Sequence, residues 1–341
     1  MKIILDAMGG DNSPYAVIDG VALSRKKDSQ TQFVIVGNLS EITKYINEKK
    51  YDFSDVQIID APEVISCEES PTVAIRQKKN SSLVVSFDML KNDESIDALI
   101  STGSTGAILA GGFLKIGRIK GVSRPSLCPV LPTKKGTNVL IIDSGANVDC
   151  KPINLCHFAI MGSIYCKELF GIQNPRVALV NVGTEDTKGN ELTKETYKLM
   201  QKLPINFIGN MEARDTLSGD YDVLVCDGFT GNVLIKSIEG AASFVMKELK
   251  TAFKSSFKAK LGAILAMSSL KKLKTKMDYN KYGGSPLLGC NKTIIKSHGS
   301  SKADTILAAI NLAKSYTNAN INGKISDAVL NMPDICEVEN V

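Results

Sequence analysis

Short runs of β-branched and other apolar residues alternate with longer helical patterns along almost the whole chain. The runs are dense in Val, Ile and Leu and lack a strict apolar–polar alternation, which is typical of strands buried on both faces. This order predicts a three-layer α/β fold, in which helices cover both faces of a twisted, parallel-rich sheet. The candidate strands are residues 2–6, 32–37, 56–60, 98–102, 138–143, 176–182, 205–209, 222–227 and 293–297, and the clearest helical patterns are 104–115, 152–170, 192–201, 230–260 and 301–315.

No long linker and no repeat divides the chain. The stretch 117–136, rich in Gly, Pro and basic residues, is the best candidate for a crossing between two lobes. We therefore expect a single catalytic unit over residues 1–341, with any lobes meeting near 117–136. The sequence has no apolar run of about 18 residues, the length that a membrane span needs. The apolar start ends at Asp6 and is too short for a signal peptide, so a cytoplasmic location is expected.

Six of the candidate strands end in a polar, glycine-bearing loop that opens a helix. These loops cover residues 6–11, 101–107, 143–147, 181–190, 227–232 and 296–301. Glycine lets the backbone approach a ligand closely, and the unpaired amides at a helix start bind anions. Because parallel strands end at one edge of a sheet, we expect these loops to line a single cleft.

Turn and cap chemistry alone accounts for any one of these loops. Taken together they favour function, because five of the six hold a side chain beyond what a cap requires. These side chains are Asp11, Asn147, Lys188, Asn232 and His298.

Several common kinds of site are absent from the sequence. No two of the 27 glycines are spaced i, i+2, and the only Gly-Lys pair, Gly323-Lys324, is followed by Ile325. The glycine patterns of dinucleotide and P-loop sites are therefore missing. The eight cysteines include no C-x-x-C, and there are only two histidines, so we expect neither a metal site nor a cofactor. Cys226 is expected to be a buried structural thiol.

The loop sequences resemble those of a known family. The matching segments are MKIILDAMGGD at 1–11, STGSTGAILAGG at 101–112, KIGRIKGVSRP at 115–125, DSGANVDCKP at 143–152, NVGTEDTKGNEL at 181–192, GNMEARD at 209–215, CDGFTGN at 226–232, DYNKYGGSPLLG at 278–289 and IKSHGSS at 295–301. In this order they closely resemble the phosphate acyltransferases of bacterial phospholipid synthesis, collinearly over 1–316. Ser144 departs from the family pattern, which has a small apolar residue there.

The resemblance implies a fold similar to isopropylmalate and isocitrate dehydrogenases and to phosphotransacetylase, in a homodimer. It implies transfer of a long-chain acyl group from acyl carrier protein to inorganic phosphate, giving acyl phosphate for a glycerol-3-phosphate acyltransferase. It also implies peripheral association with the membrane. A phosphotransacetylase-like enzyme that uses acyl-CoA, a metal-dependent decarboxylating dehydrogenase and a membrane-recruited scaffold for lipid enzymes are the alternatives.

The resemblance and the loop chemistry together suggest roles for individual residues. Phosphate is expected to contact Asp11, Gly103, Ser104, Thr105, Gly106, Asn147, Gly183, Gly189 and Asn190. The expected catalytic residues are Lys188, Asp227, Asn232 and His298. Among them Asn232, His298 or Lys188 would donate to the oxyanion. Asp227 would orient Lys188 or take a phosphate proton, and His298 would protonate the leaving thiolate.

The net charge of +5 is concentrated in one segment. Between Lys247 and Lys276 lie nine lysines and a single acid, Glu248, which leaves −3 for the rest of the chain. Apolar residues recur there at steps of four, which predicts a basic amphipathic helical segment at about 240–276, broken at Gly262. Such local charge indicates an acidic partner or surface and not general nucleic-acid binding.

Three uses of this segment stay open: a dimer interface, insertion into an anionic membrane surface, and contact with the acidic carrier protein. The residues expected at a membrane or carrier-protein contact are Lys254, Phe257, Lys258, Leu261, Leu265, Met267, Lys271 and Lys272.

Overall fold

The computed structural model describes residues 1–277 and 279–332. Its strands form two sheets, and the first has the order β3-β2-β1-β4-β12-β11-β5. Strands β3 to β12 of this order are parallel, and β11 is antiparallel to both of its neighbours. The strands are β1 (Lys2–Asp6), β2 (Gln32–Gly37), β3 (Gln57–Asp60), β4 (Ala98–Ser101), β5 (Ser126–Leu127), β11 (Ser285–Leu288) and β12 (Thr293–Lys296).

The second sheet has the order β6-β7-β10-β8-β9, parallel except for β6. Its strands are β6 (Val130–Pro132), β7 (Asn138–Ile142), β8 (Arg176–Asn181), β9 (Asn206–Glu212) and β10 (Val223–Val225). The α/β class predicted from the sequence is confirmed. The prediction of a single sheet is wrong. The strands form two sheets, and the short strands β5 and β6, two and three residues long, are the end strands of the first and second sheet. Both lie within the stretch 117–136.

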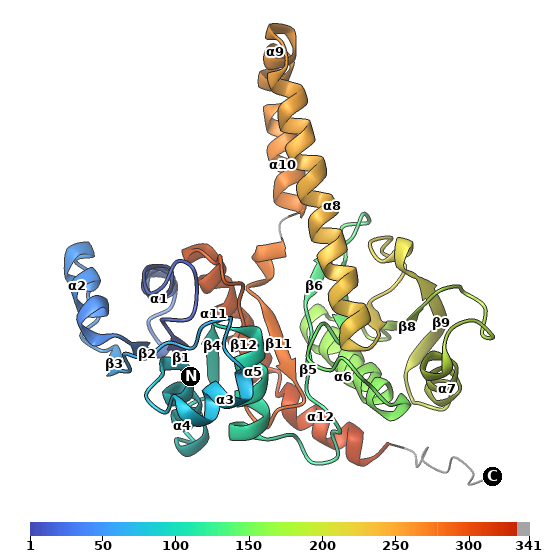
Figure 1. Cartoon of the computed structure of the whole chain (residues 1–341), viewed down its shortest axis with the longest axis horizontal. Coiled ribbons are helices and arrows are strands. Elements are labelled where there is room, and N and C mark those ends of the chain that lie inside the picture. Colours follow the sequence, from blue (N-terminus) through green and yellow to red (C-terminus); the bar gives the residue numbers. More distant parts are fainter. Residues whose placement is uncertain (278, 333–341) are drawn as a thin grey trace.

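Helices cover both faces of the first sheet (Figure 1). On one face Ile3 and Leu5 of β1 pack with α1 (Tyr15–Lys27) and α11 (Ala303–Asn318). On the other face Ile4 packs with α4 (Ser82–Asn92). This alternation follows from the period of two in a strand. The remaining elements of this lobe are α2 (Leu39–Lys49), α3 (Pro71–Gln77), α5 (Thr105–Gly111) and the short helices η1 (Gly112–Ile116) and η3 (Tyr279–Tyr282).

The second sheet packs against α6 (Pro152–Phe170), a helix rich in apolar residues with Phe158 and Tyr165 fully buried. α12 (Ile321–Leu330) packs on α6 and buries Ile321 and Ile325. The other face is covered by the first turns of α8, through Leu234 and Ile235. α7 (Glu191–Met200) and η2 (Ala213–Asp215) complete this lobe.

α8 (Gly228–Lys254) continues far beyond the sheet, and with α9 (Phe257–Leu265) and α10 (Met267–Met277) it forms a projecting arm (Figure 1). The predicted break at Gly262 is wrong, because this glycine lies inside α9. The chain breaks at Ser255 and Ser256 instead. The Ser256 side chain accepts a hydrogen bond from the Ala259 N–H at 3.1 Å and so starts a new helix. Within the described residues, no helix has the length and apolar character to cross a membrane.

Candidate functional site

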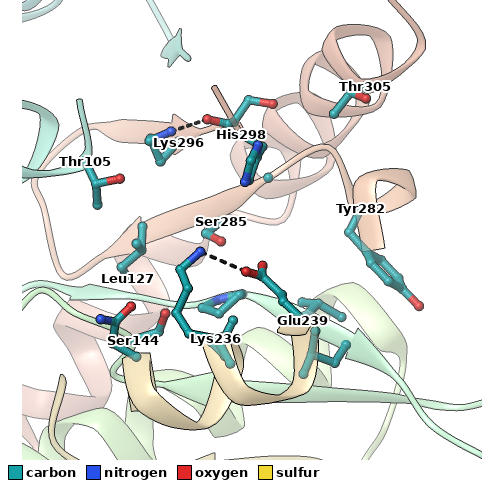
Figure 2. Close-up of a pocket in the computed structure, with 17 residues that line it drawn as sticks. Thr105, Leu127, Ser144, Lys236, Glu239, Tyr282, Ser285, Lys296, His298 and Thr305 are labelled. Carbon is teal, nitrogen blue, oxygen red and sulfur yellow. Dashed lines mark hydrogen bonds and ion pairs between the residues drawn. The ribbon is translucent and has the colours of Figure 1, made fainter. Parts of the chain in front are cut away.

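A cavity of about 170 Å³ lies between the first sheet and the base of the arm (Figure 2). One wall comes from the end of β12 and the loop after it, with Thr105 at the start of α5 beside them. The opposite wall comes from β5, β6 and α8. Its polar lining includes Thr105, Ser144, Asn232, Lys236, Glu239, Tyr282, Ser285, Lys296, Ser297, His298 and Thr305. The cavity is therefore formed jointly by the lobe built on the first sheet and the lobe built on the second sheet.

Lys296 is the last residue of β12, and the register of the sheet sets its position. It pairs with Ser101 of β4, which in turn pairs with Asp6 of β1. The Lys296 Nζ donates to the carbonyl oxygen of Ser297. Burial lowers the pKa of Lys296 to about 8, against the attraction of Asp11 and Asp6. A cation with so little solvation is well suited to bind an anion.

His298 lies on the same wall, and its tautomer is set by a backbone contact. The N–H of Ser300 donates to Nδ1 at 3.2 Å, and the Ser300 hydroxyl lies 2.8 Å from the same nitrogen. Because Nδ1 accepts a hydrogen bond, the proton of the neutral ring is on Nε2. Burial, followed by the charge of Lys296, lowers the pKa of His298. The neutral imidazole is thus the prevalent form at pH 7, with Nε2–H as a donor.

Across the cavity, α8 presents Lys236 and Glu239 on one face (Figure 2). The Lys236 Nζ lies 2.8 Å from Glu239 Oε2. The charge of Lys236 contributes to the low pKa of Lys296, and both Lys236 and Glu239 act on the pKa of His298. Two lysines, one histidine and one carboxylate therefore form a single electrostatic cluster around the cavity.

A buried carboxylate, that of Asp6, supports the wall of the cavity that the first sheet forms. Asp6 is 1% exposed and accepts hydrogen bonds from the hydroxyls of Ser82 and Ser101, each at 2.6 Å. Burial raises the pKa of Asp6, while these hydrogen bonds oppose the shift. Above it, a Cβ at Gly9 would lie 2.4 Å from the Cα of Gly103. Only glycine allows these two loops to approach so closely, and their contact fixes the start of α5.

A family model described as a fatty acid synthesis protein matches residues 1–324. A phosphate acyltransferase from Clostridioides difficile is 46% identical over 321 residues, covering 94% of each chain. Another from Bacillus licheniformis is 44% identical over 334 residues, covering 98% of this chain and all of the relative. The chain belongs to the phosphate acyltransferase family. It is accordingly an acyltransferase enzyme.

Solved structures support the fold of this family member. A branched-chain phosphotransacylase from Enterococcus faecalis has a TM-score of 0.57 at 12% identity, covering 93% of this chain and 99% of that one. The EutD phosphotransacetylase from Staphylococcus aureus has a TM-score of 0.55 at 16% identity, covering 96% and 94%. The predicted likeness to the phosphotransacetylase fold is confirmed.

In this phosphate acyltransferase family member, several sequence-predicted residues meet at the cavity. Thr105, Asn232 and His298 line it. Asp11 lies next to it, since its N–H donates to the Gly299 carbonyl at 2.9 Å. Gly103 and Ser104 immediately precede α5, and Gly106 is its second residue, so all three are neighbours of Thr105 in the chain.

Asn147 and Asp227 make hydrogen bonds that stabilise the fold. The buried Asn147 amide donates to the Pro125 carbonyl at 2.7 Å and to Asp143 Oδ2 at 3.0 Å. Asp227 caps α8, accepting from the N–H and the hydroxyl of Thr230, each at 2.8 Å. Neither lines the cavity.

The loop from β8 to α7 lies apart from this lining. Lys188 is exposed, and its N–H donates to the Glu185 carbonyl at 3.2 Å. Gly183 and Gly189 belong to the same loop, and Asn190 caps α7 through the N–H of Thr193. Within residues 1–277 and 279–332, no ion pair joins Lys188 to Asp227.

The arm exposes most of the residues predicted to contact a membrane or the carrier protein. Phe257 and Leu265 are 83% and 80% exposed, and Leu261, Met267, Lys254, Lys258 and Lys271 are also exposed. The side chain of Lys272 lies outside the described residues.

Sequence reasoning missed Lys296, Lys236 and Glu239. Lys296 had a signal, since it ends a strand two residues before His298 in the segment IKSHGSS. Lys236 and Glu239 had none, because charged residues within a helix normally indicate a solvated face.

Proposed function

We propose that this chain transfers the acyl group of a long-chain acyl carrier protein thioester to inorganic phosphate, giving acyl phosphate and carrier protein. The observation that carries the proposal is the cation-rich cavity between the lobes, lined by Lys296, His298 and Lys236. Its volume of about 170 Å³ suits phosphate and the reacting end of a thioester, so the long acyl chain lies outside it. The name of the relatives, phosphate acyltransferase, supports phosphate as the acyl acceptor.

Hydrogen phosphate needs positioning more than activation, because it is already an anionic nucleophile. One of its oxygens attacks the thioester carbonyl, and the C–S bond then breaks. The proton of hydrogen phosphate ends on the leaving sulfur, which balances the reaction. Lys296 holds the phosphate, and the neutral His298 on the same wall donates an Nε2–H hydrogen bond that stabilises the thiolate until the phosphate proton reaches the sulfur.

The oxyanion formed at the carbonyl requires a hydrogen-bond donor. Asn232 is our candidate, because its amide lines the cavity at the first turns of α8. The backbone amides of residues 103–106, with Asp11 beside them, complete the proposed phosphate site. We keep Lys188 as a proposed phosphate ligand, with Asp227 as its partner.

The arm supports further parts of the proposal. Its tip carries exposed Phe257 and Leu265 among lysines, a composition that suits peripheral insertion into an anionic membrane surface. Its shaft exposes Phe244 and Val245, 64% and 55%, which suits a homodimer. Cytoplasmic enzyme held at the membrane in this way would deliver acyl phosphate to a glycerol-3-phosphate acyltransferase, for phosphatidic acid and phospholipid synthesis.

The deciding experiment incubates the protein with palmitoyl-acyl carrier protein and phosphate and traps acyl phosphate with hydroxylamine. We expect palmitoyl hydroxamate that depends on both substrates, at rates well above those with palmitoyl-CoA. Faster turnover of palmitoyl-CoA would favour the phosphotransacetylase-like alternative. Vesicle binding with no acyl phosphate from either thioester would favour the scaffold.

A further inference from the structure

The carboxylate of Glu239 lines a cavity whose lining also includes the two cations Lys236 and Lys296. Its side chain is 23% exposed, whereas that of its partner Lys236 is 61% exposed, so the acid is the more enclosed member of the pair. The His298 loop lies opposite, and the charge of Glu239 reaches it. An acid at this place calls for an explanation, because a carboxylate repels a fully ionised oxyanion.

Hydrogen phosphate differs from sulfate because it carries a proton at neutral pH. Glu239 can accept a hydrogen bond from this P–OH, while Lys296 and His298 on the opposite wall can donate to the unprotonated oxygens. Sulfate has no such proton, so one of its oxygens would face the carboxylate with like charge.

The structure assigns to Glu239 the selection of hydrogen phosphate over fully ionised oxyanions, with Lys236 fixing the carboxylate through the 2.8 Å contact. This assignment rests on the proposed function in taking phosphate as the substrate of the cavity. It also orients the nucleophile. When the P–OH faces α8, the unprotonated oxygens face Lys296 and the approaching thioester. Glu239 is thus a specificity and positioning residue.

The test measures anion binding directly, by titration calorimetry of the full chain with inorganic phosphate and with sulfate at pH 7.5 and fixed ionic strength. The variant is Glu239→Gln, which removes the charge but still accepts from Lys236 through its amide oxygen. The matched control is Glu248→Gln, which removes the same charge from an exposed position further along α8.

We expect the wild type and Glu248→Gln to bind phosphate in clear preference to sulfate. In Glu239→Gln sulfate binding should tighten by about tenfold, while phosphate binding changes much less, so the preference collapses. An unchanged phosphate-to-sulfate ratio in Glu239→Gln, or no phosphate binding by the wild type, would overturn the assignment. Acyl phosphate formation is measured separately, so failure of the reaction is distinguishable from failure of the selectivity.

Discussion

At the scale of single residues, the cavity depends on a lysine whose charge is weakly solvated. Lys296 lies at the end of a buried strand, and burial lowers its pKa to about 8. An unfolded lysine has its ordinary pKa of 10.5, so the folded chain binds the proton less tightly. Below about pH 8 the buried charge costs stability, and that cost is relieved as the pH rises from about 8 to 10.5. A bound anion would relieve it at neutral pH instead.

This pKa predicts the pH dependence of phosphate use. The cation is the acid form, so kcat/KM for phosphate should fall as the pH rises through about 8. Phosphate has its own second ionisation near neutral pH, which lies below the inflection expected from Lys296. Lys296→Met should lower kcat/KM by roughly 100- to 1000-fold, remove the inflection, and raise the melting temperature at pH 7. Steady-state kinetics from pH 6.5 to 9.5 check this.

Lys296→Arg is the matched control, because arginine keeps its charge over this range. Its profile should show no fall near pH 8, even if its rate is lower. A wild-type profile that stays flat through pH 9, or a Met variant with near-normal rates, would rule out Lys296 as the phosphate cation.

At the scale of elements, α8 links the cavity to the arm. Its first turns bury Leu234 and Ile235 on the second sheet and present Lys236 and Glu239 to the cavity. Beyond the sheet the same helix exposes apolar side chains, and α9 at the tip has no buried residue. No described part of this chain covers the apolar side chains at the tip. We therefore expect these side chains to contact a surface outside this chain.

We expect the tip to anchor the protein on anionic vesicles. Phe257→Ser combined with Leu265→Ser should weaken binding by at least roughly 100-fold, since each such side chain contributes ~1.5–3 kcal/mol on full burial. Co-sedimentation with vesicles of anionic phospholipid measures this. Turnover of soluble palmitoyl-acyl carrier protein should be unchanged.

The control for the tip is Leu39→Ser, at the start of α2 and 44% exposed. It should bind vesicles as the wild type does. Equal vesicle binding by the tip variant would exclude membrane insertion. Loss of carrier-protein turnover in that variant would assign the tip to the carrier protein.

At the scale of the whole molecule, two sheets of different strand order enclose one cavity. The first sheet ends at β5 and the second at β6, and these two strands follow each other in the chain. Residues of β5 and β11 also line the cavity. The arm projects from this body (Figure 1). Its shaft exposes the apolar side chains of Phe244 and Val245. Pairing of two such shafts would bury Phe244 and Val245 on each chain.

We therefore expect a dimer in solution that depends on the shaft. Phe244→Asp should weaken the dimer by roughly 100-fold and yield folded monomer, because an unpaired charge would be buried at the interface. Sedimentation velocity and circular dichroism measure the two effects. Leu114→Asp, on η1 and 41% exposed, is the control and should leave the dimer intact. A wild-type monomer, or a dimeric Phe244→Asp variant, would contradict this arrangement.

Much of the fold could be predicted because short stretches of the sequence indicate which residues are buried. The strands at Lys2–Asp6 and Gln32–Gly37 match their predicted bounds, since continuous apolar runs flanked by polar loops have few alternatives. The antiparallel strands β5, β6 and β11 were not predicted. They are two to four residues long and pair with partners that no local pattern identifies.

The sequence by itself determined the α/β class, the family and the loops that begin α5 and follow β12, because short-range patterns encode which residues are buried and where glycine is required. The tertiary structure alone decided that the strands divide between two sheets. It also decided that Lys236 and Glu239 lie opposite His298, which is far from both in the sequence. It also placed Lys188 on an exposed loop away from them. The physical reason is that packing of distant parts of the chain forms a cavity between lobes. The local sequence around one lining residue does not indicate which other residues will lie beside it.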